Sequence, residues 1–336
     1  MGRALDGRLL AKALADPQSV ANLGGAGWQA LLTMARAELL SASLAYRLDG
    51  IPKPAAAERF LEDAKASCEQ GRTLALWETE MARRALAPLG VPVVLLKGSA
   101  FIAAGLAAGR GRFVGDLDIL VPRADIDRVE PALLGAGWEW VKPDPYDDAY
   151  YRRWMHELPP LIHRDRDRMI DVHHTILPLT AKPTPDAAAL IADSELLENG
   201  LRVLNPNDMI CHAAAHLFAD GDLSGGMRNL WDIHCLIEES GVAGLGARAQ
   251  YHGLASAVAR AVRQAQALYG TILPDSWPAQ GSTDPLFTRR LTARDGWGRQ
   301  SRPATQLGFY IRSHWLRMPP LMLARHLWTK WRKGAA

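Results

Sequence analysis

The chain has 336 residues, of which 48% are hydrophobic and 22% are charged. These values are typical of globular proteins, exclude wholesale disorder and predict two or three domain-sized segments. The net charge of +3 is unevenly distributed, because residues 1–295 carry 31 basic and 36 acidic side chains, whereas eight basic and no acidic residues follow Asp295. The net charge of −5 over residues 1–295 disfavours a broad nucleic-acid-binding surface.

The N-terminal residues and the cysteines predict a cytoplasmic protein. Asp6 and Arg8 interrupt the apolar residues at the start of the chain, so no secretory signal peptide is visible. The longest uncharged run, residues 17–35, contains one Asn and three Gly and is too polar for a transmembrane segment. The cysteines are far apart and odd in number, which argues against a disulfide scaffold; they are Cys68, Cys211 and Cys235.

Helical spacing dominates the first 90 residues. Apolar side chains recur at helical intervals over residues 28–48, and the prolines of segment 51–54 end that helix. A second helix is predicted over residues 55–89, with Gly90 just beyond its end. We therefore assign residues 1–90 to a helical N-terminal segment.

The sequence pattern changes at residue 91, where short runs rich in β-branched residues begin to alternate with helical segments. The predicted elements are a strand over 91–96, a helix over 100–108, a strand over 115–121, a helix over 124–135 and a strand over 169–177. Pro131 lies inside the second of these helices. The alternating order predicts a small α/β core over residues 91–180.

Helical patterns return in residues 181–336, which we assign to a helical C-terminal domain. Asn205-Pro206 is a typical helix start. The predicted helices cover residues 209–219, 226–239 and 250–269, and the stretch 275–305 is predicted to be a loop. The chain then closes with an aromatic and basic helical tail that Pro319-Pro320 interrupts.

Two carboxylates on one predicted strand and a third on another are the strongest chemical signal. Side chains alternate along a strand, so Asp116 and Asp118 project from the same face. Neighbouring carboxylates repel each other unless a cation lies between them, and oxygen ligands suit Mg²⁺ or Mn²⁺. Asp171, on a neighbouring strand, would complete a two-metal site for phosphoryl transfer.

A second signal is the Lys97-Gly98-Ser99 turn between a predicted strand and a predicted helix. The free backbone N–H groups and the dipole of a helix N-terminus attract anions, which suits a triphosphate. Glycine allows close approach of the backbone. The later Gly-Arg-Gly-Arg run, residues 109–112, is not a Walker loop because no Gly-Lys-Ser/Thr closes the required spacing.

Taken in order, the runs LLKGSA, RFVGDLDILV and IDVHH resemble the uncharacterised nucleotidyltransferases of the polymerase-β-like superfamily. The superfamily signature is matched by Gly98-Ser99 and by Asp116-Leu117-Asp118. Arg112 stands four residues ahead of the first Asp, as in this subfamily, and Asp171 is followed two positions later by His173. The runs NPNDMICHAAAH and RNLWDIH resemble the family's helical C-terminal part, so the resemblance covers roughly residues 70–240.

The resemblance implies an α+β fold: a small mixed-sheet nucleotidyltransferase core flanked by helical segments. It also implies a role for each motif residue. Asp116 and Asp118 would hold both metal ions, Asp171 would bind the catalytic metal near the attacking hydroxyl, Gly98 and Ser99 would hold the β- and γ-phosphates, and Lys97 and Arg112 would add positive charge near the triphosphate.

The implied reaction transfers a nucleoside monophosphate from an NTP to a hydroxyl of a small-molecule or peptide acceptor, with Mg²⁺ or Mn²⁺ as cofactor. The alternative is a non-catalytic nucleotide-binding or antitoxin-like regulatory module on the same fold. Three retained carboxylates argue against this alternative, because a dead site has no use for closely spaced like charges.

Several histidines are candidates for lesser roles. His173 is expected to orient Asp171, to contact substrate or to lie in the core, and His156 is a candidate substrate contact. His212 and His216 share one helix face, but no nearby carboxylate or cysteine cluster completes a tetrahedral zinc site with them.

The C-terminal tail has two interpretations. Residues 308–333 contain six basic residues, no acidic residue and several aromatic ones, a combination that suits a peripheral contact with an anionic partner or surface. Such a contact would place the tail at the acceptor entrance. Alternatively, the aromatic side chains pack the tail onto the helical domain while the charges stay solvated.

Overall fold

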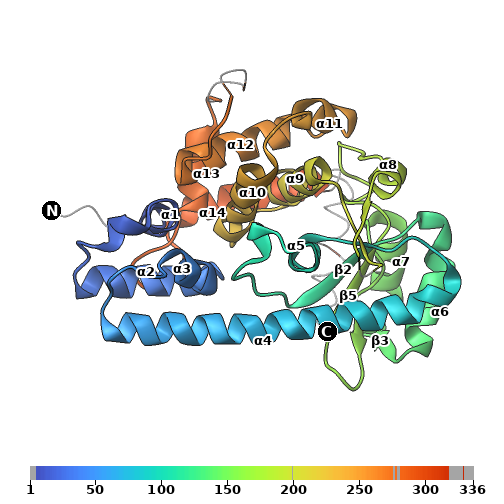
Figure 1. The fold of residues 1–336 in the computed structure, drawn as a ribbon. Coiled ribbons are helices and arrows are strands. Elements are labelled where there is room, and N and C mark those ends of the chain that lie inside the picture. The colour runs from blue at the N-terminus through green and yellow to red at the C-terminus, as the bar shows by residue number, and fades with distance from the viewer. Residues whose placement is uncertain (1–4, 199, 275–276, 278–280, 318–327, 329–336) are drawn as a thin grey trace.

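The computed structural model describes residues 5–198, 200–274, 277, 281–317 and 328 (Figure 1). In this part of the chain the strands form one seven-stranded sheet in the order β3-β4-β5-β2-β1-β7-β6. The strands are β1 Val94–Leu95, β2 Asp116–Leu120, β3 Trp138–Trp140, β4 Leu161–His163, β5 Met169–His173, β6 Glu195–Leu196 and β7 Arg202–Val203.

The sheet is mixed, which confirms the predicted α+β class. β2 pairs in parallel with β5, and β1 pairs in parallel with β7, whereas the other neighbouring strands are antiparallel. In the β2–β5 pair Asp118 lies directly opposite Asp171. This register decides the geometry of the site, because residues opposite each other in neighbouring strands point to the same face.

The N-terminal helices are α1 Arg8–Ala15, α2 Gly25–Ala37, α3 Ser41–Arg47 and α4 Ala55–Leu86. The prediction of one helix over residues 28–48 is wrong. Leu39 adopts a left-handed φ of 55° and divides the segment, while the carboxylate of Glu38 turns inward to accept a hydrogen bond from Arg294 (2.6 Å). The apolar spacing continues across this break, so the sequence does not reveal it. The second predicted helix is confirmed as α4, which runs from the N-terminal helices to the sheet (Figure 1).

Four shorter helices accompany the sheet: α5 Lys97–Ala103, α6 Ile126–Gly135, α7 Pro145–Trp154 and α8 Ala187–Ala192. α6 forms as predicted with Pro131 inside it. The capping residue of α7 is Asp144, whose side chain accepts hydrogen bonds from the backbone of Tyr146 and Asp147.

The C-terminal helices are α9 Pro206–Ala214, α10 Gly226–Ser240, α11 Leu245–Tyr251, α12 Ala255–Tyr269, α13 Asp284–Leu291 and α14 Pro303–Arg317. The side chain of Asn205 caps α9, as its sequence predicts. The predicted helix over residues 250–269 instead begins at Ala255, after a turn at Gly253 (φ 69°). The predicted loop over residues 275–305 contains α13, whose first residue, Asp284, is buried against Arg263 (2.6 Å).

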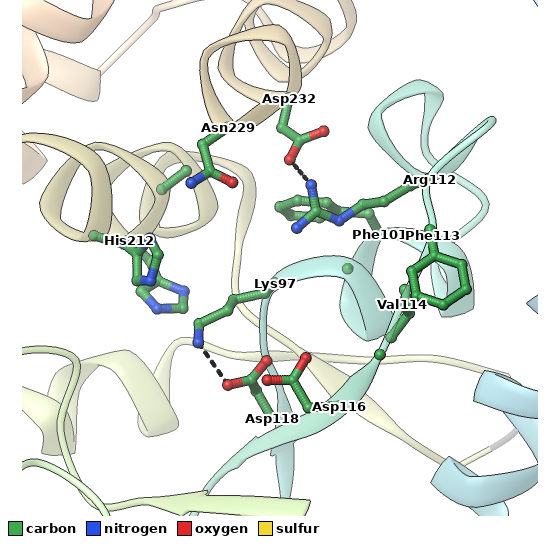
Figure 2. A pocket seen from close by; sticks show the side chains of 14 residues that line it. Lys97, Phe101, Arg112, Phe113, Val114, Asp116, Asp118, His212, Asn229 and Asp232 are labelled. Atoms are coloured by element: carbon green, nitrogen blue, oxygen red, sulfur yellow. Dashed lines mark hydrogen bonds and ion pairs between the residues drawn. The ribbon is translucent and has the colours of Figure 1, made fainter. Parts of the chain in front are cut away.

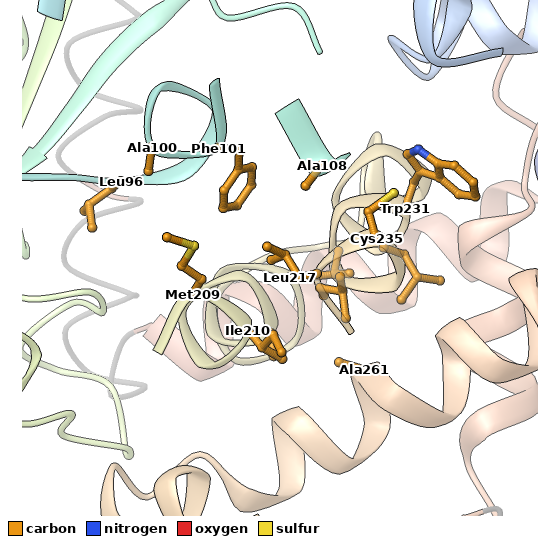
Figure 3. Packing of buried hydrophobic residues seen from close by; sticks show 14 of the residues in the cluster. Leu96, Ala100, Phe101, Ala108, Met209, Ile210, Leu217, Trp231, Cys235 and Ala261 are labelled. Carbon is orange, nitrogen blue, oxygen red and sulfur yellow. The ribbon is translucent and has the colours of Figure 1, made fainter. Parts of the chain in front are cut away.

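A continuous apolar core joins the sheet to these helices. Figure 3 shows side chains of the α5 region, among them Leu96 and Phe101, above Met209 and Ile210 of α9. The same core reaches Ala261 of α12. Helix α9 therefore packs against the α5 region, and α12 belongs to the same core.

No described helix is long and apolar enough to cross a membrane. The cysteines Cys68, Cys211 and Cys235 are buried and free. The break predicted at Pro319-Pro320, and the tail bases Arg325, Lys330, Arg332 and Lys333, lie outside the described residues.

Candidate active site

The three predicted carboxylates meet at one end of the β2–β5 pair. One oxygen from each of Asp116, Asp118 and Asp171 lies within 4.8 Å of the other two. Asp116 is exposed, Asp171 is half-buried and Asp118 is 3% exposed. The parallel register and the alternation of β2 produce this cluster, as the sequence predicts.

Hydrogen bonds fix Asp118 from two sides. Lys97 Nζ donates to Asp118 Oδ1 at 2.6 Å (Figure 2), and His173 Nε2 lies 3.0 Å from the same oxygen. His173 is 1% exposed, and its Nε2 contacts Asp118 and lies 3.5 Å from Glu157 Oε2, so it does not orient Asp171 directly. His156 is also mostly buried, with its ring centroid 5.1 Å from that of His173.

These surroundings drive the pKa values of two neighbouring carboxylates apart. Burial alone would raise the pKa of Asp118, but Lys97 and the hydrogen bond from His173 outweigh it and hold that pKa below its usual range. For Asp171, burial and the charges of Asp118 and Asp116 act in the same direction and raise the pKa to about 7. Asp171 Oδ1 is buried without a hydrogen-bond partner among the described residues.

The turn before α5 has the strained geometry often found at functional sites. Lys97 adopts a positive φ of 49°, which L-residues rarely do. Gly98 follows, and a Cβ there would lie 2.6 Å from Arg112 Nε and 2.7 Å from Val114 Cγ2. Only glycine therefore lets the turn approach Arg112. The side chain of Ser99 is buried, and its Oγ has no hydrogen-bond partner within the described chain.

A cavity of about 230 Å³ opens between this turn and α10. Figure 2 shows Lys97, Asp116 and Asp118 on one side and Asn229 and Asp232 of α10 on the other. The complete lining is Lys97, Gly98, Phe101, Arg112, Phe113, Val114, Gly115, Asp116, Asp118, His212, Ala213, His216, Asn229 and Asp232.

Arg112 lines the cavity, and α10 holds it there. Arg112 Nη1 donates to Asp232 Oδ2, and Arg228 Nη2 donates to Asp232 Oδ1. Arg228 Nη1 in turn donates to Ser43 Oγ (2.6 Å). The sequence marks Asp232 only by its place in the RNLWDIH run. The i, i+4 spacing from Arg228 permits their ion pair but does not reveal that both face Arg112.

The loop that carries Arg112 is also held against α3. Gly111 has a φ of 73°, and a Cβ there would lie 2.5 Å from the backbone nitrogen of Ser43, so this position requires glycine. Ser43 Oγ donates to the carbonyl of Gly111 (3.1 Å), and the Arg110 guanidinium lies 4.6 Å from the Tyr46 ring centroid. The position of Arg112 thus depends on N-terminal helices as well as on α10.

His212 and His216 line the far wall of the cavity. Burial lowers the pKa of His212 well below its ordinary value and that of His216 to about 3, so both imidazoles are neutral near pH 7. His216 belongs to a π-helical turn, η5 (Ala215–Asp220), that continues α9. Such turns often occur at functional sites. The sequence places both residues in the NPNDMICHAAAH run and argues against a zinc site formed by them.

Nucleotidyltransferases are the class of protein to which this fold and this cluster of carboxylates point. The chain belongs to the uncharacterised nucleotidyltransferase family, because the model of that family matches residues 24–270. The match confirms the resemblance seen in the motifs and begins well before residue 70, so it includes helices α2, α3 and α4.

Comparison with curated proteins finds no match. Among solved structures, the chain is similar to the solution structure of the antibiotic-resistance factor ANT(2'')-Ia, which is described as showing substrate-regulated conformation dynamics. The TM-score is 0.39 and the sequence identity 12%, over 56% of this chain and 96% of that chain. A likeness of this degree assigns no individual residue.

Proposed function

We propose that the protein transfers a nucleoside monophosphate from an NTP to a hydroxyl of a small-molecule or peptide acceptor, with pyrophosphate as the leaving group. The observation that carries this proposal is the cluster of Asp116, Asp118 and Asp171 beside a cavity lined by Lys97 and Arg112. Negative ligands for cations lie next to positive side chains for phosphates, which is the charge arrangement that phosphoryl transfer needs.

The carboxylate cluster fits Mg²⁺ or Mn²⁺. Its donor atoms are all oxygens, the ligands that both ions prefer, and Asp171 Oδ1 is buried without a hydrogen-bond partner in the described chain. Burial raises the pKa of Asp171 most, and the charges of Asp118 and Asp116 raise it further; a bound cation would relieve that repulsion. In this proposal Asp116, Asp118 and Asp171 hold the ions, which supply charge neutralisation at the attacking and leaving oxygens.

The chain's own residues then divide the remaining tasks. Lys97 and Arg112 contribute positive charge on the triphosphate side of the cavity, while Gly98 and Ser99 bring the backbone of the α5 turn close to the phosphates. Asp171 lies on the acceptor side, where it orients the attacking hydroxyl. His173 acts through Asp118, by fixing the orientation of that carboxylate.

The acceptor is proposed to be a small molecule or a peptide rather than a nucleic acid. Residues 1–295 carry a net charge of −5 and include every element that forms the cavity. A protein that binds a polynucleotide backbone needs an excess of positive charge around its site, which a net negative charge does not provide.

The experiment that tests the function uses the full chain with Mg²⁺ or Mn²⁺ and each α-labelled NTP in turn, with and without a small-molecule and peptide extract. We expect pyrophosphate release and label transfer that depend on the metal and on the extract. The Asp116→Asn variant is the matched control, because it removes one ligand and keeps the side chain's shape. Tight NTP binding without label transfer under any of these conditions would instead support the regulatory module.

Arg112→Ala should weaken NTP binding by roughly 10-fold or more, with a smaller loss for the NMP. A charge-assisted hydrogen bond contributes roughly 1.5–3 kcal/mol, and the arginine is proposed to face the β- and γ-phosphates, which an NMP lacks. Calorimetric titration with a non-hydrolysable NTP and with the NMP, both with Mg²⁺, measures the two losses.

Lys97→Ala should likewise weaken NTP binding more than it weakens NMP binding. Arg128→Ala is a suitable control, because Arg128 is exposed on α6 and pairs with Asp125 (2.9 Å) away from the cavity. If Arg112→Ala and Lys97→Ala bind the NTP as tightly as the wild type does, the triphosphate lies elsewhere.

A further inference from the structure

Helix α14 presents an apolar face to solvent. Leu307, Tyr310, Ile311 and Trp315 are 59%, 52%, 57% and 60% exposed. Their i, i+3, i+4 and i+8 spacing places them along one side of the helix. Among the α14 side chains that the structure describes, no charged one is exposed, and the exposed side chains with a hydrogen-bonding group are Tyr310 and Trp315.

Arg312 and Ser313 of α14 point the other way, whereas His314 packs against the ring of Tyr310 with a centroid distance of 4.5 Å. Arg312 donates to the backbone carbonyls of Phe218 and Gly221, and its guanidinium lies 5.1 Å from the ring centroid of Phe287. Ser313 is 4% exposed and Phe309 is 8% exposed. The helix is thus anchored to the protein by its polar side and by Phe309. This arrangement is opposite to that of an ordinary surface helix, whose apolar side faces the core.

Of the two interpretations of the tail, packing onto the domain therefore accounts for Phe309 but not for Tyr310 and Trp315. A row of four large apolar side chains on one helix face indicates a surface that another body covers. The occupant can be chosen from the charge of the segment to which α14 belongs.

We propose that the α14 face docks on the surface of an anionic lipid bilayer. Eight basic residues and no acidic residue follow Asp295. Arg302 pairs with Asp6 and Arg312 faces the body. The other six bases lie close to α14 in the sequence: Arg299, Arg317, Arg325, Lys330, Arg332 and Lys333. Apolar and aromatic side chains on a segment rich in basic residues are complementary to a negatively charged membrane surface.

The composition of the exposed face suits the membrane interface rather than the membrane interior. Tyr310 and Trp315 have amphipathic rings of the kind that concentrate at the headgroup level. α14 spans only 15 residues, and no described helix meets the requirements of a membrane span. The helix would therefore lie in the plane of the surface, with its apolar side chains inserted among the lipids.

The experiment is co-sedimentation of the full chain with vesicles of phosphatidylcholine alone and of phosphatidylcholine with about a third phosphatidylglycerol, a mixture in the range where surface charge matters. We expect binding to the anionic vesicles, weak binding to the neutral ones and a loss of binding at high salt. Trp315→Glu and Ile311→Glu should each lower the partition coefficient about 10-fold or more. Trp77→Glu on α4 is the matched control, because Trp77 is 56% exposed on another helix.

A second set of variants separates charge from apolar insertion. Replacing Arg325, Lys330, Arg332 and Lys333 with Gln should lower binding to the anionic vesicles about 100-fold and leave the weak binding to neutral vesicles unchanged. Circular dichroism and thermal unfolding should show that all variants fold, since the substituted α14 side chains are exposed.

Two results would overturn the proposal. One is equal recovery of wild type and Trp315→Glu with anionic vesicles, whether both bind or neither does. The other is a stable dimer in sedimentation equilibrium that Ile311→Glu dissociates, with no vesicle binding, because the face would then meet a second copy of the chain. Neither result depends on nucleotide transfer, so the proposed catalytic function stands or fails separately.

Discussion

Asp118→Asn is expected to lower both turnover and stability, whereas Asp116→Asn lowers turnover alone. Loss of one proposed metal ligand should reduce kcat by roughly 10²–10⁴-fold in either variant, which corresponds to several kcal/mol of transition-state stabilisation. Only Asp118, at 3% exposure, is buried against Lys97 Nζ (2.6 Å) and His173 Nε2 (3.0 Å). Removal of its charge leaves Lys97 without its partner.

The expected cost of Asp118→Asn is about 2–3 kcal/mol of unfolding free energy. Breaking a fully buried ion pair costs about 3–5 kcal/mol, and the value here is lower because the Lys97 side chain is 25% exposed. Urea unfolding of both variants in EDTA measures the difference. The double variant Asp118→Asn/Lys97→Met should recover part of the lost stability. Equal stability of the two single variants would contradict the buried ion pair.

Asp171→Asn should stabilise the protein at pH 8 in EDTA while it lowers kcat by roughly 10²–10⁴-fold. The pKa of Asp171 is raised from 3.8 to about 7 in the folded protein. The folded state therefore holds this proton more tightly than the unfolded chain does, so stability falls as the pH rises from about 4 to about 7. Above pH 7 the full penalty applies, up to about 4 kcal/mol.

The neutral amide of Asn removes this penalty. The gain in unfolding free energy should therefore be largest at pH 8 and clearly smaller at pH 5, which urea unfolding at the two pH values measures. Asp63→Asn, at an exposed carboxylate on α4, controls for the loss of one negative charge and should show no such pH dependence. If the gain in unfolding free energy for Asp171→Asn is the same at both pH values, the pKa of Asp171 is not raised.

The sequence predicted those helices and strands in which the spacing of apolar residues repeats often enough to show a period. α4 repeats its helical spacing over 32 residues, and β2 alternates charged and apolar side chains. β6 and β7 have two residues each, and β3 has three, too few to show any period. Their pairing depends on neighbours supplied by the sheet rather than on their own residues. The division of α2 from α3 at Leu39 is hidden for a different reason, because the apolar spacing is the same on both sides of it.

For the site, too, local sequence patterns predicted some features, and other features depend on tertiary contacts. Alternation and motif order were sufficient to bring Asp116, Asp118 and Asp171 together. From the sequence alone Asp116 and Asp118 are equivalent, and only the tertiary structure gives Asp118 its two partners. Likewise, the pairing of Arg112 with Asp232 joins residues 120 positions apart. The spacing of residues within either segment gives no sign of a contact between positions so far apart in the sequence.

The loop that carries Arg112 also determines how small a working fragment of this protein can be. A fragment limited to residues 91–180 would keep all three carboxylates and the α5 turn, but it would lack Ser43, against which Gly111 is packed, and Asp232, which holds the arginine. In the proposed mechanism such a fragment would keep the cation ligands but lose the contacts that hold Arg112 toward the triphosphate. A minimal nucleotidyltransferase cut from this chain must therefore extend at least from α3 to α10.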